Sequence, residues 1–213
     1  MYVAAAIESD PARVRKMFDT NVFGVFDMVT AFVPLLLAAV PDSRAPPTII
    51  NASSILGRLP YPFAGPYNAT KAAITSYSDT LRVELGPLGL KVVTLFMGEV
   101  STGLMTTDMV SIGPDSLYAD VEGTVRERIR IHTQDSIKPK EFAAQVVNGV
   151  LSKPAAGKGE YLWKGTNATL IWLLDTFGWR KIFDPTMESG VDFNKKEIRK
   201  AIFEKGQDKS RRE

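Results

Sequence analysis

Three residues in the run SSILGRLPYPFAGPYNATK (53–71) could together move a proton to or from a carbonyl oxygen. Tyr67 and Lys71 lie four positions apart at the start of a predicted helix, so their side chains share one face. An ammonium beside a phenol stabilises the phenolate and lowers its pKa, which makes the tyrosine a usable general acid or base. Ser54 stands thirteen residues before Tyr67 and could hydrogen-bond the same carbonyl. The Tyr-x-x-x-Lys spacing alone is common on solvated helices, so the position of the serine matters.

The elements around these residues predict where the three side chains meet. Residues 48–54 (TIINASS) are typical of a short buried strand, and a helix is expected from about Tyr67 to Leu85. A second strand at 90–96 is followed by the polar loop 97–108. Short apolar strands that alternate with helices indicate a parallel α/β sheet. Ligands bind beyond the carboxyl ends of such strands, where both polar loops are expected to lie.

A long apolar helix is predicted before the first strand. Ser9 or Asp10 is expected to cap it, with Pro11 in its first turn, and the pattern runs to about residue 40. Residues 22–40 are almost wholly apolar, which raises the question of a membrane span. Because Asp27 near the middle would be costly in lipid, we interpret the segment as a core helix buried between the sheet and a partner surface.

The second half of the chain gives weaker signals. Helices are expected at 121–132 and 138–153, with a last strand at 159–163. Residues 166–183 carry two Trp and two Phe in an amphipathic arrangement. This segment could be a substrate lid, an oligomer contact or an interfacial membrane helix, and we favour packing because aromatic stripes usually mark cores. The basic C-terminal end is interpreted as a solvated, partly helical tail.

Composition excludes several classes of protein. The 213 residues, 45% hydrophobic and 23% charged, fit one globular domain. Net charge is only +2, with basic residues spread along most of the chain, so no nucleic-acid footprint is predicted. The sequence has no Cys and one His, His132, which excludes disulfides, thiolate nucleophiles and His-rich metal sites. His132 lies in an Arg-rich segment and is expected to be exposed and not catalytic. The N-terminus does not read as a signal peptide, which favours an intracellular setting.

The pattern resembles that of the short-chain dehydrogenases/reductases. SSILG, YNATKAAITSYSDTLRVEL and GLKVVTLFMGEVSTGL are similar to the catalytic half of these enzymes, which place a Ser thirteen positions before Tyr-x-x-x-Lys. MFDTNVFGVFDMV resembles the helix that supplies the fourth family residue, here Asn21. The resemblance is close over residues 10–105 and implies hydride transfer between a nicotinamide dinucleotide and a carbonyl or alcohol.

The resemblance implies a role for each of the four residues. Tyr67 would give or take the proton, and Ser54 would polarise the carbonyl. Lys71 would lower the pKa of Tyr67 and, with Tyr67, hold the cofactor at its nicotinamide ribose. Asn21 would position a water in the proton relay, although an Asn in an apolar helix could instead bond a backbone carbonyl.

The loop after the second strand resembles the family's cofactor loop. Gly98, Val100 and Thr102 fit the positions that contact the nicotinamide carboxamide and phosphates. Met97 replaces the usual Pro, which we expect to loosen the turn only slightly. Thr102 could equally be an ordinary loop or capping residue.

The motifs of the nucleotide-binding half of this family are not found. A dinucleotide site needs a Gly-rich turn after its first strand, yet the 213 residues contain neither G-x-x-x-G-x-G nor Asn-Asn-Ala-Gly. The expected fold class is α/β, the C-terminal part of a doubly wound parallel (Rossmann-type) sheet with its first strands absent and one edge exposed. We expect a single partial domain, 1–213, with a catalytic core at 10–105, a substrate loop and C-terminal region at 106–185, and a charged tail at 186–213.

Two functions remain open from the sequence. One is an NADP(H)-dependent oxidoreductase, NAD not being excluded, that acts on the ketone or alcohol of a lipid-like or secondary-metabolite substrate. Residues 14–39 and the Trp-rich segment resemble fungal reductases related to 1-acyldihydroxyacetone-phosphate reductase. The other is a catalytically inactive truncated relative that acts as a dimerisation module, because helices 11–40 and 67–85 resemble the family's dimer-forming pair. A homo-oligomer is expected, as is a cytoplasmic location with contact to the endoplasmic reticulum or lipid-droplet surface through the aromatic segment.

Overall fold

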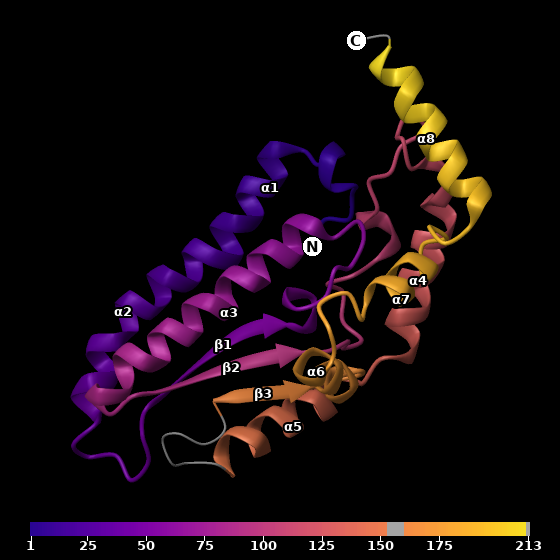
Figure 1. Cartoon of the computed structure of the whole chain (residues 1–213). Coiled ribbons are helices and arrows are strands. Elements are labelled where there is room, and N and C mark those ends of the chain that lie inside the picture. Colours follow the sequence, from indigo (N-terminus) through magenta and orange to yellow (C-terminus); the bar gives the residue numbers. More distant parts are fainter. Residues whose placement is uncertain (153–159, 212–213) are drawn as a thin grey trace.

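A three-stranded parallel sheet forms the centre of the molecule (Figure 1). The computed structural model describes residues 1–152 and 160–211. Strand β2 (Lys91–Met97) lies between β1 (Thr48–Ser54) and β3 (Tyr161–Lys164), and both neighbours pair with it in parallel. The predicted parallel α/β sheet is therefore confirmed, with each strand within two residues of its expected bounds. Gly159, which the prediction included in the last strand, lies outside the described residues.

The position of each strand follows from its residues. Strand β2 is apolar almost throughout and all but its last residue are buried, as expected for a central parallel strand. Strand β1 is an edge strand, and only one of its faces is well covered. On that face Asn51 donates to the Ser78 hydroxyl at 2.9 Å, and Ser53 lies 2.7 Å from the Thr75 hydroxyl. The predicted burial of the first strand holds for the face that α3 covers, whereas Ile50 and Ala52 on the other face are exposed.

Two long helical segments cover one face of the sheet (Figure 1). The first comprises α1 (Pro11–Phe18), a π-helical turn (Asp19–Phe23) and α2 (Gly24–Ala39). The second is α3 (Gly65–Leu85), which packs directly on β1 and β2. The predicted start of the first helix is confirmed, because the Asp10 carboxylate accepts hydrogen bonds from the next two available amides at 2.7 and 3.0 Å. The π turn within it was not predicted.

The long N-terminal helix is covered on one side and exposed on the other. Pro11–Ala39 is long and apolar enough to cross a membrane by length and composition, but only 11% of its most apolar window is buried. Val29 packs into a cluster with residues of α3 and β2, whereas Phe32 and Leu35 are exposed. The side toward α3 and the sheet is covered as expected within the described residues, and the partner surface expected on the other side stays a prediction.

Helix α5 (Pro139–Leu151) covers the opposite face of the sheet (Figure 1). Four further helices lie toward the carboxyl ends of the strands: α4 (Glu122–Asp135), α6 (Ala168–Phe177), α7 (Asp184–Ser189) and α8 (Lys196–Ser210). The predicted helices at 121–132 and 138–153 are confirmed except at Lys153, which lies outside the described residues. The short helix α7 was not predicted. The charged tail contains the end of α7 and all of α8, joined by turns at 190–195, and residues 212–213 lie outside the described part.

Candidate active site

A cavity of about 500 Å³ opens at the carboxyl ends of β1 and β2. Ser54 ends β1, Tyr67 lies on α3, and Gly98 follows β2, and all three line this cavity. The two polar loops therefore meet where the sequence predicted. The rest of the wall is mostly apolar and includes Leu56, Leu59, Leu104, Met105, Phe142, Leu170, Ile171 and Met187.

Ser54 is held where the strand turns into a short 3-10 helix. Its backbone is extended, and its hydroxyl accepts a hydrogen bond from the Leu56 amide at 3.1 Å. The same hydroxyl donates to the Met97 carbonyl at 3.3 Å, a long bond that joins β1 to the loop after β2. Ser54 also lies near the Tyr67 phenol and lowers its pKa. Ser54 and Tyr67 thus form a polar pair on the cavity wall.

Burial shifts the pKa of both Tyr67 and Lys71. Burial raises the pKa of the Tyr67 phenol, and the nearby Ser54 opposes that rise. The Lys71 ammonium donates to the Ala52 carbonyl at 2.9 Å and lies 5.6 Å from the centre of the Tyr67 ring. Burial lowers the pKa of Lys71 as well. The predicted lowering of the Tyr67 pKa by Lys71 is therefore not found, because loss of solvent outweighs the other influences on this phenol.

Asn21 reaches the helix that carries Tyr67 and Lys71. It lies in the π-helical turn, and its side-chain amide donates to the Thr70 hydroxyl at 3.2 Å. Thr70 in turn donates to the Tyr67 carbonyl at 2.8 Å. The alternative in which Asn21 donates to a backbone carbonyl is not what the structure shows. A π turn widens a helix by one residue and occurs often at functional sites.

The loop after β2 is locked to the loop after β3 by backbone contacts. The Gly98 amide donates to the Lys164 carbonyl at 2.8 Å, and Glu99 and Thr166 exchange two hydrogen bonds of 3.1 Å. A Cβ on Gly98 would lie 2.1 Å from the Thr166 carbonyl oxygen. Gly165 opposite it has a φ of +100°. Only glycines fit this crossing.

The other two predicted cofactor residues also line the cavity. Val100 forms a parallel bridge with Ile137, and Thr102 accepts a hydrogen bond from the Leu104 amide at 3.3 Å. The Thr102 hydroxyl therefore caps a local turn, which is the ordinary role that the sequence left open. Both residues hold the shape of the loop that forms one side of the cavity.

Sequence reasoning missed a polar group around Glu99. The His132 Nδ1 lies 2.7 Å from one Glu99 carboxylate oxygen, and the Asn167 amide donates to the other at 3.3 Å. The expectation that His132 is exposed was wrong, because its side chain is only 24% exposed and lines the cavity. Arg128, four residues earlier on α4, also lines the cavity, and this helical spacing was a signal that could have placed both on one face.

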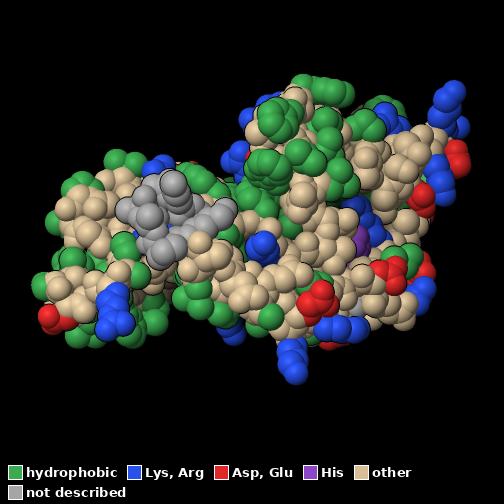
Figure 2. Space-filling model, turned by 90° about the horizontal axis from the view of Figure 1, so that it is seen from below, with side chains coloured by type: hydrophobic (Ala, Val, Ile, Leu, Met, Phe, Trp, Pro, Cys, Tyr) green, Lys and Arg blue, Asp and Glu red, His purple; other side chains and the backbone are tan. Residues whose placement is uncertain are grey.

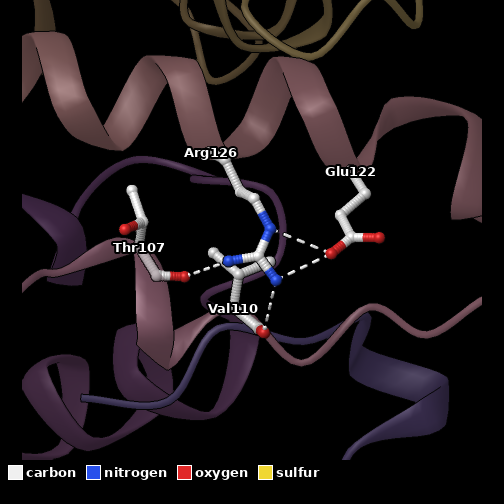
Figure 3. Close-up of polar contacts among 4 residues, drawn as sticks. All are labelled: Thr107, Val110, Glu122 and Arg126. Atoms are coloured by element: carbon white, nitrogen blue, oxygen red, sulfur yellow. Dashed lines mark hydrogen bonds and ion pairs between the residues drawn. The ribbon is translucent and has the colours of Figure 1, made fainter.

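Arg126 ties the loop that carries Leu104 and Met105 to α4 (Figure 3). Its guanidinium donates to Glu122 at 2.7 and 2.9 Å, to the Val110 carbonyl at 3.4 Å and to the Thr107 carbonyl. Arg126 therefore links the loop to the helix, in addition to the packing of Val110 against Val125.

The family model for short chain dehydrogenases matches residues 2–110. The chain belongs to the short-chain dehydrogenase family. This short-chain dehydrogenase is 37% identical over 185 residues to the short-chain dehydrogenase virD of Hypocrea virens, covering 86% of this chain and 61% of that protein. It is 35% identical to fogD of Aspergillus ruber, covering 91% of this chain and 65% of the relative. The chain thus spans somewhat less than two thirds of the length of these relatives.

Other similar proteins bring more specific names. The NADPH-dependent 1-acyldihydroxyacetone phosphate reductase of Schizosaccharomyces pombe is 34% identical over 145 residues, covering 66% of this chain and 47% of that enzyme. The solved short-chain dehydrogenase of Streptomyces avermitilis has a TM-score of 0.63 at 25% identity, covering 83% of this chain and 62% of its own. A Burkholderia cenocepacia short chain dehydrogenase, solved in complex with NADP, also has a TM-score of 0.63, at 22% identity over 87% of this chain and 63% of its own. These structures confirm the Rossmann-like α/β fold.

Proposed function

We propose that this short-chain dehydrogenase provides the catalytic part of an NADP(H)-dependent oxidoreductase that reduces a ketone or oxidises an alcohol. The observation that carries the proposal is the Ser54–Tyr67 pair on the wall of a largely apolar cavity, with Lys71 beside the Tyr67 ring. The apolar wall suits a lipid-like or secondary-metabolite substrate. The named S. pombe relative supports NADPH as the cofactor and a lipid-like substrate.

The residues present fit the nicotinamide end of the dinucleotide. Gly98, Val100 and Thr102 line the same cavity as Tyr67. Lys71 supplies a cation beside Tyr67 that could hold a ribose hydroxyl. When bound, the nicotinamide supplies the hydride for reduction or accepts it in oxidation. The pyrophosphate needs a Gly-rich turn that the 213 residues do not contain.

The chain's own residues would move the proton. In reduction, the Tyr67 hydroxyl donates its proton to the carbonyl oxygen, and in oxidation the phenolate takes it back from the alcohol. Because burial raises its pKa, Tyr67 is protonated at neutral pH, which suits proton donation. Ser54 can turn its hydroxyl from the long bond with the Met97 carbonyl toward the substrate oxygen. Asn21 supports the helix behind Tyr67 through Thr70.

A fluorescence titration with NADPH tests the proposal on this chain. Saturable binding supports the proposal, and no binding at millimolar NADPH would refute it for these 213 residues. Turnover is tested in a form that binds NADPH, with a panel of apolar ketones. Tyr67→Phe is expected to abolish reduction without loss of folding, whereas Tyr77→Phe, on the side of the same helix that packs against Phe26 of α2, should leave the rate unchanged.

The exposed side of the N-terminal helix favours a second candidate, a pairing module without catalysis. Phe23, Met28, Phe32 and Leu35 are all exposed on one long apolar segment. Such surfaces mark protein contacts, and a homo-oligomer is the simplest use of this one. Analytical ultracentrifugation separates the candidates when combined with the NADPH titration. A dimer that binds no cofactor favours the pairing module, and a dimer that binds cofactor is compatible with the enzyme.

We also propose that α6 contacts a lipid surface. The helix packs inward through Ala168 and Ile171, but Phe177 at its end and Trp179 just beyond it are 78% and 70% exposed. Apolar side chains gather over the region of α6 on the face that Figure 2 shows. Arg180 and Lys181 follow directly and would favour anionic headgroups. A cytoplasmic enzyme at the surface of the endoplasmic reticulum or of lipid droplets would use such a contact.

Vesicle sedimentation tests the lipid contact. The chain should sediment with vesicles of phosphatidylcholine and phosphatidylserine, and replacing both Phe177 and Trp179 by Ser should release it. The matched control replaces Phe32 by Ser, because that residue is also exposed but lies on α2. Equal sedimentation of all variants would contradict a specific role for α6.

A further inference from the structure

Arg128 is a cation in the cavity wall that has no anionic partner among the described residues. Its guanidinium lies 4.3 Å from the centre of the Tyr61 ring, and one terminal nitrogen lies 3.6 Å from the Met187 sulfur. The other terminal nitrogen is buried and has no hydrogen-bond acceptor. A Cβ on Gly190 would come within 2.6 Å of that nitrogen, so the guanidinium is packed between an aromatic ring and a backbone.

The nearby carboxylate does not neutralise this cation. Glu99 lines the same cavity, but its two oxygens are paired with His132 and Asn167. Within the described residues Arg128 forms no ion pair, although Arg126 and Arg130 on the same helix both do. A partly buried cation without an acceptor is costly unless an anion meets it, because charge-assisted hydrogen bonds are among the strongest in proteins. Stacking on Tyr61 holds the guanidinium in place but supplies no acceptor.

We propose that Arg128 binds an anionic oxygen group of the substrate, so that the cavity takes a largely apolar carbonyl compound that also carries a carboxylate or phosphate. The inference rests on the proposed function for the carbonyl but concerns a separate part of the cavity wall. Leu104, Met105 and Ile171 enclose the apolar body of such a molecule, and Arg128 selects its charged group. Arg128 is a specificity residue here and takes no part in the proton transfer at Tyr67.

Binding of three probes with one alkyl chain and different head groups tests the proposal. Decanoate, decyl phosphate and decanol are titrated against the chain without cofactor, and tryptophan fluorescence reports binding. We expect at least one anionic probe to bind about 10-fold or more tightly than decanol, in line with a hydrogen bond to a charged group. Arg128→Gln should reduce this preference to less than about 3-fold while changing decanol affinity little. The probe with the larger loss identifies the head group.

Arg130→Gln is the matched control, because Arg130 lies two residues further along α4 and points to solvent, where it pairs with Glu127. It should keep the full preference. If Arg128→Gln does not fold by circular dichroism, Tyr61→Leu and Tyr61→Phe replace it. Loss of the ring should weaken the preference for the anionic probe, whereas loss of only the hydroxyl should preserve it.

Equal binding of all three probes to the unmodified chain would overturn the proposal, as would an unchanged preference in Arg128→Gln. The assay contains no cofactor and measures no turnover, so its result is independent of the NADPH titration. An anion preference without NADPH binding would refute the oxidoreductase and leave the Arg128 site standing. NADPH binding without an anion preference would refute the Arg128 site and support the oxidoreductase.

Discussion

Replacing Gly98 by Ala tests how tightly the two loops at the cavity are joined. The new Cβ would lie 2.1 Å from the Thr166 carbonyl oxygen and 3.0 Å from the Gly165 carbonyl carbon. The first distance is more than 1 Å short of the 3.4 Å at which ordinary van der Waals contact begins. All these atoms belong to backbone, so no side chain can rotate away, and the loops after β2 and β3 must separate.

The cost can be worked from the contacts that the separation disturbs. Forcing extra atoms into a packed site typically costs about 1–3 kcal/mol. The two hydrogen bonds that Glu99 and Thr166 exchange would also be strained or lost, at about 0.5–1.5 kcal/mol each. We therefore expect Gly98→Ala to lower the free energy of unfolding by about 2–6 kcal/mol, a large share of the roughly 5–15 kcal/mol that is typical of natural domains.

Urea denaturation followed by circular dichroism measures this loss. Gly103→Ala is the matched control, because Gly103 lies in the same loop and a Cβ there has no neighbour within 4 Å. It should stay within about 1 kcal/mol of the unmodified chain. A Gly98→Ala variant as stable as Gly103→Ala, with the same denaturant slope, would refute the view that this crossing admits only glycine.

Three further perturbations probe other parts of the structure. In an ultraviolet titration, the signal lost in Tyr67→Phe should belong to a phenol that ionises above its ordinary pKa of 10.0, because burial raises that pKa. The contribution of Tyr67 to the free energy of unfolding is therefore fully present below pH 10 and is lost as the pH rises further. Ionisation of this phenol below pH 10 would contradict the reasoning. Ile74→Ala, at a fully buried position of α3, should cost about 2–5 kcal/mol in thermal or urea unfolding, whereas Ile7→Ala at an exposed position should cost less than about 0.5 kcal/mol. Arg126→Gln removes the hydrogen bonds to the loop carbonyls in Figure 3, so the backbone amides of residues 104–110 should exchange faster with deuterium. The free energy of unfolding should fall by about 1–2 kcal/mol. Unchanged exchange would show that these hydrogen bonds do not hold the loop.

Local patterns were sufficient to predict the strands and the helix that carries Tyr67 and Lys71. Apolar runs bounded by polar loops locate β1 and β2, and the four-residue spacing puts the two side chains on one face of α3. The meeting of Ser54 with Tyr67 also followed, because parallel strands place their following loops at one edge of the sheet. These features depend on short sequence separations or on a general rule of α/β topology.

Features that depend on tertiary packing were out of reach. The pairing of Glu99 with His132 joins two segments that no local pattern connects. The rise in the Tyr67 pKa depends on how much solvent the surrounding elements remove, whereas the spacing to Lys71 gives proximity alone. The π turn was missed because it lies in an apolar run that reads equally well as an uninterrupted α-helix.

The π turn at Asp19–Phe23 also fixes the rotational phase between α1 and α2. Each residue of an α-helix advances the chain by about 100° around the axis. Deleting the exposed Phe23 would restore ordinary α spacing with α1 and α2 still nearly in phase, yet Asn21, inside the turn, would rotate by part of that angle and its amide would move relative to Thr70. A relative that lacks one residue here could thus keep all four residue types of the tetrad in its sequence and still have lost the arrangement that they form.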